Sequence, residues 1–200
     1  NIGLRQVSTF TFADGQSFSL QELLDNSVVV INNALDNVTV DRSASTYNET
    51  INNSGHFDTI LLGGGTTTVN DTGSDNIIYG GTGSAVINAS ANSSIFVGSG
   101  SVNINAASSD AIHGGAGDAL ITVAAGVAGV QIFEQTAGAG ANGFDSVVLS
   151  GAVSVDEFTL SSVGKDLTLT DSLGAQVLTL KDGLDATAVA KAVADFAFSD

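Results

Sequence analysis

The 200-residue sequence contains no cysteine, proline, methionine or tryptophan. The absence of cysteine excludes disulfide bonds and metal sites of the CxxC type. No apolar run reaches about 18 residues, the length that predicts a membrane-spanning helix. Because methionine is absent and the chain opens at Asn1 without a basic and apolar leader, we expect an internal piece or a processed form of a longer protein.

Positively charged residues are also scarce. Five lysines and arginines stand against 21 aspartates and glutamates, which gives a formal net charge of −16. A field of this sign repels nucleic acids and anionic lipids, so we expect neither a nucleic-acid partner nor membrane insertion. It attracts divalent cations, which would screen the repulsion between copies of an abundant protein. A solvated acidic surface without a dedicated ion site explains the same composition.

The sequence offers little for catalysis. His56 and His113 are the only histidines, and neither is paired with a recognisable serine or cysteine nucleophile, so both are interpreted as turn residues. Solenoid enzymes acting on uronate sugars need cations to neutralise the substrate carboxylate, and none lies between Arg42 and Lys165. We therefore expect no enzymatic activity, and a carbohydrate-active enzyme ranks third among three functional classes.

A repeat with a period of about 17 to 18 residues runs through the middle of the chain. Isoleucines recur at this spacing, and a second apolar series follows nine or ten residues behind them. This halved period predicts a β-solenoid, of the β-roll or β-helix kind, in which each coil has two short strands and two turns. The predicted core stack is Ile60, Ile77, Ile95, Ile112, Val69, Ile87, Ile104 and Ile121.

Asparagines keep the same spacing, at Asn52, Asn70, Asn88 and Asn105. Stacked coils would place these side chains above one another, at a strand spacing of roughly 4.8 Å that allows a ladder of amide hydrogen bonds. The alternative is that asparagine is simply common in turns.

The predicted fold is all-β, with a solenoid of about four coils flanked by strand-rich segments and two short helices. The first helix begins at the capping-box pattern Ser19 to Glu22, and an alanine-rich second helix covers about residues 186–194. The predicted division is 1–50 for a hairpin, the first helix and lead-in strands, 51–126 for the solenoid, 127–143 for a Gly/Ala-rich connection, and 144–200 for a strand-rich segment with the second helix.

The two ends of the chain resemble each other. The segment Phe196-Ala197-Phe198-Ser199-Asp200 repeats the pattern of Phe10-Thr11-Phe12-Ala13-Asp14 at a distance of 186 residues. This predicts slightly more than one unit of a tandem array. Coincidence is the alternative, since only five residues are compared.

Two segments carry a degenerate nonapeptide motif, GGxGxDxUx. The segment 80–88, Gly-Gly-Thr-Gly-Ser-Ala-Val-Ile-Asn, fits except at the acidic position, and 114–122 has its Asp118 one place early. With these motifs the chain resembles the secreted bacterial repeats-in-toxin proteins, also known as haemolysin-type calcium-binding proteins. The resemblance implies calcium-dependent folding outside the cell after type I secretion, and hence an extracellular or cell-surface location.

Calcium sites of such proteins combine an aspartate carboxylate with carbonyl groups of Gly-rich turns. In the predicted register, the acidic positions and most Gly-Gly turns lie on opposite edges of the solenoid. Only the turn 70–75 combines both, so Asp71 and Asp75 are the predicted calcium ligands, with Asp58 a neighbour one coil away. The alternatives are a metal-free solenoid held by apolar and asparagine stacking, or calcium at the junctions between units.

Together these features favour a non-enzymatic structural repeat module of a large secreted surface protein. Such a module would assemble end to end with copies of itself into a fibre, sheath or surface layer, since a solenoid has two exposed ends that must be capped or paired. The second interpretation is a calcium-stiffened spacer or ligand-binding module of a type I secreted adhesin, with contacts to a cell surface or polysaccharide.

Overall fold

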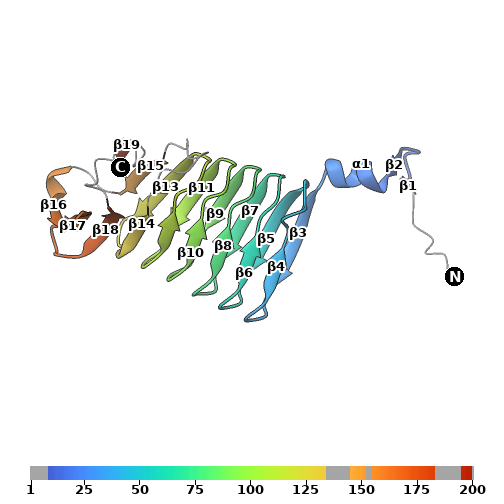
Figure 1. Cartoon of the computed structure of the whole chain (residues 1–200). Coiled ribbons are helices and arrows are strands. Elements are labelled where there is room, and N and C mark those ends of the chain that lie inside the picture. The colour runs from blue at the N-terminus through green and yellow to red at the C-terminus, as the bar shows by residue number, and fades with distance from the viewer. Residues whose placement is uncertain (1–8, 134–144, 152–154, 183–194, 200) are drawn as a thin grey trace.

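The computed structural model describes residues 9–133, 145–151, 155–182 and 195–199. Over these residues the chain winds into a β-solenoid, in which each coil contributes one strand to each of two sheets (Figure 1). The predicted all-β solenoid is therefore confirmed. Residues 51–126 hold four strand pairs, from β5 and β6 to β11 and β12, and in addition β13, in rough agreement with the expected number of coils.

The eight-stranded sheet has the order β3-β5-β7-β9-β11-β13-β15-β19 among the described residues. All neighbouring strands in it are parallel. Its strands are β3 (Val28–Asn33), β5 (Asn48–Asn53), β7 (Thr67–Asp71), β9 (Ala85–Asn88), β11 (Val102–Ala106), β13 (Ala119–Ala124), β15 (Asp145–Ser150) and β19 (Asp195–Ser199).

The nine-stranded sheet has the order β4-β6-β8-β10-β12-β14-β18-β17-β16. It is parallel as far as β18, and β16 and β17 are added as an antiparallel hairpin. Its strands are β4 (Thr39–Asp41), β6 (Thr59–Leu61), β8 (Ile77–Tyr79), β10 (Ser94–Phe96), β12 (Ala111–His113), β14 (Val130–Phe133), β16 (Phe158–Val163), β17 (Asp166–Asp171) and β18 (Gln176–Lys181), and the 3-10 turn Val155–Glu157 precedes β16.

The N-terminal elements follow the sequence prediction. Strands β1 (Thr9–Thr11) and β2 (Ser17–Ser19) form an antiparallel hairpin, and helix α1 (Leu20–Asp25) follows it directly. The Ser19 hydroxyl accepts a hydrogen bond from the Glu22 amide, and the Glu22 carboxylate accepts one from the Ser19 amide, so the predicted capping box is present. The second predicted helix and residues 134–143 of the predicted connection lie outside the described residues. In the described part of the chain, no helix is long and apolar enough to cross a membrane.

Seven of the eight predicted core residues are fully buried, and Ile77 is the exception. Ile77 is 36% exposed, whereas its neighbour Ile78 is 0% exposed. In the sheet, Ile78 is in register with Ile60 and Ile95. Successive side chains of a strand point to opposite faces, so only one of two adjacent isoleucines can enter the core. The average period of the repeat did not distinguish Ile77 from Ile78, and the prediction of Ile77 as the core residue was wrong.

The solenoid extends beyond the predicted range 51–126 on both sides. Strands β3 and β4 form a first coil, and β14, β15, β18 and β19 continue the stack at the other end. The outer coils differ in length from the repeat, since Asn32 and Asn52 are 20 residues apart and Ala119 and Asp145 are 26 apart. In addition, the β16–β17 hairpin lies between β15 and β18 in the chain. A search for a constant period therefore misses these coils.

Glycine recurs in the turns because successive coils approach closely there. A Cβ atom added at Gly100 would lie 1.8 Å from the carbonyl oxygen of Gly83, and one added at Gly83 would lie 2.0 Å from that of Gly65. No side chain fits at such distances, so the residue that lies against the carbonyl of the preceding coil must be glycine, whether that carbonyl belongs to a glycine or, as below Gly65, to Tyr47.

Candidate functional site

The inward positions at one corner of the solenoid are polar. This corner lies where each strand of the eight-stranded sheet leads into the next strand of the nine-stranded sheet, and in the later coils its positions become apolar, as at Val123 and Leu149. We call this set the polar corner. Its members are Asn33, Asn53, Asp58, Asp71, Asn76, Ser93 and Asp110, and all except Asn33 are buried.

Asp58 is held by donors from the first coil. One carboxylate oxygen accepts a hydrogen bond from the Val38 amide at 2.8 Å, and the other accepts one from the Asn33 side chain at 2.8 Å. The Asp58 amide donates to the side-chain oxygen of Asn76 at 2.8 Å. Both oxygens of this buried carboxylate are thus satisfied by N–H groups.

Asp71 lies in the same network, one coil further. Its carboxylate accepts hydrogen bonds from the side chains of Asn53 at 3.1 Å, Asn76 at 2.9 and 3.0 Å, and Ser90 at 3.1 Å. Asn76 therefore joins Asp71 to Asp58, since its amide nitrogen donates to one residue and its oxygen accepts from the other. The two acids thus lie on successive coils, joined through Asn76. The predicted register had placed Asp75, rather than Asn76, in line with Asp58.

Asp75, the third predicted calcium ligand, lies outside this network. It sits in the turn before β8 with a φ of 62°, it is only half-buried, and its carboxylate accepts a hydrogen bond from the Ser74 hydroxyl at 2.6 Å. Among the residues that the structure describes, no group of three or more histidines, cysteines, aspartates or glutamates is placed to hold a metal ion. The structure thus brings Asp58 and Asp71 together and separates both from Asp75.

Asp110 is the most perturbed acid of the polar corner. Its two carboxylate oxygens accept hydrogen bonds from the amides of Ser93 at 2.9 Å and Ala107 at 2.7 Å. Burial raises the pKa of Asp110 from its ordinary value of 3.8 to about 7, and the charge of Asp71 acts in the same direction. The hydroxyl of Ser93 beside it is buried without a hydrogen-bond partner in the described part of the chain.

We expect Asp110 to make the stability of the solenoid depend on pH. Its pKa is raised in the folded state, so the folded protein keeps this proton between pH 3.8 and about 7 while the unfolded chain loses it. The stabilisation is fully present below pH 3.8 and is lost as the pH rises through about 7. Between these values the free energy of unfolding of the wild type should fall relative to Asp110→Asn by up to about 4 kcal/mol.

Urea unfolding of both proteins at a series of pH values tests this expectation. Asparagine replaces only one of the two acceptor oxygens, so a constant offset between the proteins is expected, and the informative quantity is the difference in slope. Parallel pH profiles from pH 4 to about 8 would contradict the assignment of the raised pKa to Asp110.

The predicted asparagine ladder is present on the outer face of the eight-stranded sheet. The side-chain amide of Asn52 donates to Asn32 at 2.8 Å, that of Asn70 to Asn52 at 2.9 Å, that of Asn88 to Asn70 at 2.9 Å, and that of Asn105 to Asn88 at 2.6 Å. Asn32 adds one rung before the predicted ones. In the next coil Asn105 is in register with Thr122, where the asparagines end.

Four aromatic rings form a second column, on the outer face of the nine-stranded sheet. Tyr79, Phe96, His113 and Phe133 are stacked with centroid distances of 4.8, 4.3 and 4.5 Å and interplanar angles of 7 to 13°. His113 thus lies in β12 rather than in a turn, and burial lowers its pKa. Each ring directly follows a buried isoleucine in the sequence. This pair of an isoleucine and an aromatic residue recurs once per coil, and the sequence prediction missed it. Because the inner rings cover each other, this column exposes edges rather than the faces on which a sugar would stack.

His56 lies in a turn, as predicted, and contacts the next coil. Its Nδ1 accepts a hydrogen bond from the Ser74 amide at 2.9 Å and lies 3.1 Å from the Ser74 hydroxyl. The two histidines therefore occupy separate structural columns, and neither is joined to the other.

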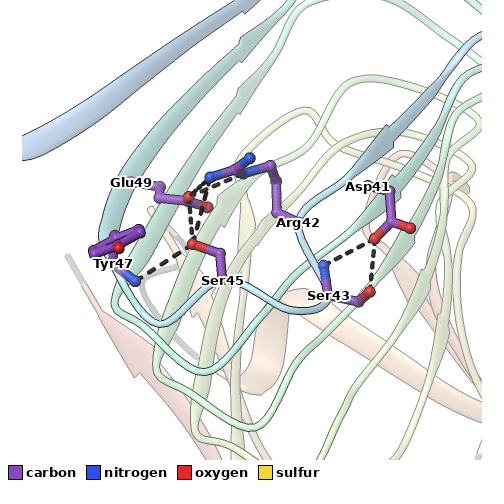
Figure 2. A network of polar contacts seen from close by, with 6 residues as sticks. All are labelled: Asp41, Arg42, Ser43, Ser45, Tyr47 and Glu49. Carbon is purple, nitrogen blue, oxygen red and sulfur yellow. Dashed lines mark hydrogen bonds and ion pairs between the residues drawn. The ribbon is translucent and has the colours of Figure 1, made fainter. Parts of the chain in front are cut away.

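The opposite corner carries an ion pair between the half-buried Arg42 and the buried Glu49, which sequence reasoning missed (Figure 2). Glu49 is buried, and one of its carboxylate oxygens accepts hydrogen bonds from the Arg42 guanidinium and from the Ser45 hydroxyl, the latter at 2.6 Å. The bond to Glu49 raises the pKa of Arg42 further. The other carboxylate oxygen of Glu49 is buried without a partner among the described residues. The pair fastens the turn after β4 to the start of β5.

Comparisons with known proteins add no family assignment. A scan against protein-family models finds no match, and a search of curated proteins finds no significant similarity. The stacked parallel coils are consistent with repeats of the repeats-in-toxin type, and the structure itself establishes a β-solenoid built from sequence repeats.

Proposed function

We propose that the protein is a structural repeat module that assembles end to end with copies of itself into an extracellular fibre, sheath or surface layer. The observation that carries this proposal is the open end of the first coil. Ile31 and Val40 are only half-buried, whereas Ile51 and Ile60, their register partners in the second coil, are 0% exposed. An apolar core that is open at one end favours stacking against a further unit.

The strands at both ends of the solenoid support the same proposal. Within the described part of the chain, β3 and β4 are the outermost strands at one end, and β19 and β16 at the other. Unpaired edges are templates for pairing with another chain. Strand β16 also exposes 61% of Leu160 and 78% of Val163. Because the two ends are different surfaces, a contact between them is heterologous, and units that continue along the solenoid axis generate an open filament rather than a closed ring.

In this proposal the negative charge of the protein controls when copies assemble. Copies with a formal net charge of −16 repel one another until ions screen the charge. The resemblance to repeats-in-toxin proteins suggests secretion into a calcium-rich exterior, where this screening would occur after export. Asp58, Asp71 and Asp75 remain the proposed calcium ligands. Calcium at Asp58 or Asp71 would have to replace the N–H groups whose hydrogen bonds these carboxylates accept in the solenoid.

Light scattering on size-exclusion fractions, in excess calcium and in chelator, tests the proposal. We expect large particles with calcium. Large particles in both conditions would show that the chain assembles without calcium. A monomer in both conditions would contradict end-to-end assembly and favour the alternative, a spacer module of an adhesin.

A matched pair of lysine variants locates the contact. Leu160→Lys places a charge on the outermost strand β16 and should reduce the particles to monomers. Leu120→Lys, on β13 in the middle of the solenoid, changes a side chain that is 40% exposed and should leave the particles intact. Equal particle sizes for both variants would show that β16 takes no part in the contact.

A further inference from the structure

The two copies of the Phe-x-Phe-x-Asp pattern occupy different strands of the structure. The C-terminal copy forms β19, which pairs in parallel with β15 so that Ala197 is in register with Val148. The N-terminal copy forms β1, which pairs antiparallel with β2 so that Thr11 is in register with Ser17. Hairpin β1–β2 and strand β19 lie at opposite ends of the solenoid (Figure 1).

Strand β1 uses one edge of this pattern. The Phe12 amide donates to the carbonyl of Gln16 at 2.8 Å, and the Phe12 carbonyl accepts from the amide of Gly15 at 2.9 Å. Backbone groups of a strand point alternately to its two edges, so Phe10 and Phe12 face β2. Thr9 and Thr11 face the other edge, along which no strand of the described residues pairs.

Strand β19 uses the opposite edge of the same pattern. The Ala125 amide donates to the carbonyl of Ser150 at 2.9 Å, so Ser150 and Val148 direct their backbone groups towards β13. Val147 then faces β19, and in a parallel ladder it bonds to the residues on either side of its register partner Phe196, namely Asp195 and Ala197. The residues of β19 that face β15 therefore correspond to Thr9 and Thr11, the residues that β1 leaves unpaired.

We propose that β1 and β19 are two copies of one strand, which in an array is shared by successive units. It pairs in parallel with β15 of the unit before and antiparallel with β2 of the unit after. The eight-stranded sheet thereby continues from one solenoid into the hairpin of the next, with a repeat of 186 residues. This inference rests on the proposed end-to-end function and identifies the partner as a second unit of this chain.

The side chains agree with this superposition. Val147 is fully buried, and its register partner Phe196 corresponds to Phe10, which is in register with Phe18. In the shared sheet, three apolar residues would therefore lie side by side in one row across neighbouring strands. The adjacent row contains Thr11 and Ser17, whose hydroxyls lie 2.8 Å apart. Phe10 is 37% and Phe12 is 50% exposed in the hairpin of the single chain, and β15 of a preceding unit would cover the edge beside them.

A tandem protein tests the shared strand. Residues 1–200 are followed directly by residues 15–200 of a second copy, so that Asp200-Gly15 repeats the Asp14-Gly15 turn. The chain has no cysteine, so Val148→Cys in the first unit and Ser17→Cys in the second give unique sites for spin labels. These positions are two strands apart in the proposed sheet, and we expect a narrow distance distribution corresponding to a Cα separation of about 10 Å.

The control joins two complete copies through a flexible Gly/Ser linker of about 20 residues, which should give a broad distribution. A broad distribution in the shared-strand protein as well would overturn the proposal. Thermal unfolding is the second measurement: the shared-strand protein should unfold in one transition at a higher temperature than the single chain, and an unchanged melting temperature would also contradict the proposal.

The tandem experiment does not depend on association of separate chains. A monomeric single chain in light scattering would contradict spontaneous assembly. The distance measurement in the tandem protein would still decide whether the strand is shared, because the two units are joined covalently. Filaments of the single chain together with a broad distance distribution in the tandem protein would overturn the shared strand alone.

Discussion

Ile78→Asp is expected to unfold the solenoid, whereas Ile77→Asp in the same strand is expected to leave it folded. Ile78 is 0% exposed and lies between Ile60 and Ile95 in the core stack. A carboxylate at this position would be buried without a partner, and we expect a loss of about 4 kcal/mol or more. The outward-facing Ile77 should tolerate aspartate at a cost of about 1 kcal/mol or less.

Urea unfolding followed by circular dichroism measures both variants. The pair is matched, because the same residue type is replaced at adjacent positions of β8. If Ile77→Asp were the more destabilising variant, the register of β8 would be the one expected from the sequence period, with Ile77 inside. Equal losses would mean that neither side chain is specifically part of the core.

Arg42→Met is expected to destabilise the protein by about 3 kcal/mol or more, because it leaves the Glu49 carboxylate buried without its cation. Glu49 is 2% exposed, and its second carboxylate oxygen already has no partner in the described part of the chain. The matched control is Lys181→Met. It removes the cation of the more exposed Lys181–Asp166 pair, for which we expect a loss of about 1 kcal/mol or less.

The double variant Arg42→Met/Glu49→Gln separates the ion pair from packing. Replacing the buried charge by a neutral amide should restore part of the stability that the single variant loses, because the main cost is the unpaired carboxylate. Chemical denaturation of the wild type, Arg42→Met, Glu49→Gln and the double variant gives the coupling energy between the two side chains. No recovery in the double variant would show that Arg42 acts through its aliphatic stem rather than through its charge.

Local and periodic features could be predicted from the sequence alone. The hairpin and the capping box depend on residues within a few positions of one another, and the amides of Ser19 and Glu22 find their partners without help from the rest of the chain. The asparagine ladder and most of the core stack depend on one residue type recurring at one spacing. Stacking converts such a period directly into contact, so Asn70 lies beside Asn52 and Asn88.

The candidate site was predictable only in part. The repeat alone placed Asp58 one coil away from the turn 70–75, which contains Asp71. That Asn76 joins the two acids and that Asp75 stands apart did not follow from the repeat, because a shift of one residue changes the face on which a side chain lies. For the same reason the sequence did not show that Glu49 points inward and meets Arg42.

The sequence by itself determined the kind of fold, namely a solenoid of two-stranded coils, since the repeat is written in residue types that stack on themselves. The tertiary structure decided which of Ile77 and Ile78 enters the core, where the solenoid begins and ends, and which polar groups meet inside it. These outcomes depend on side-chain facing and on coils of unequal length, such as the 26 residues from Ala119 to Asp145. A constant period contains neither, because both arise only when the coils are stacked and their backbone ladders are aligned.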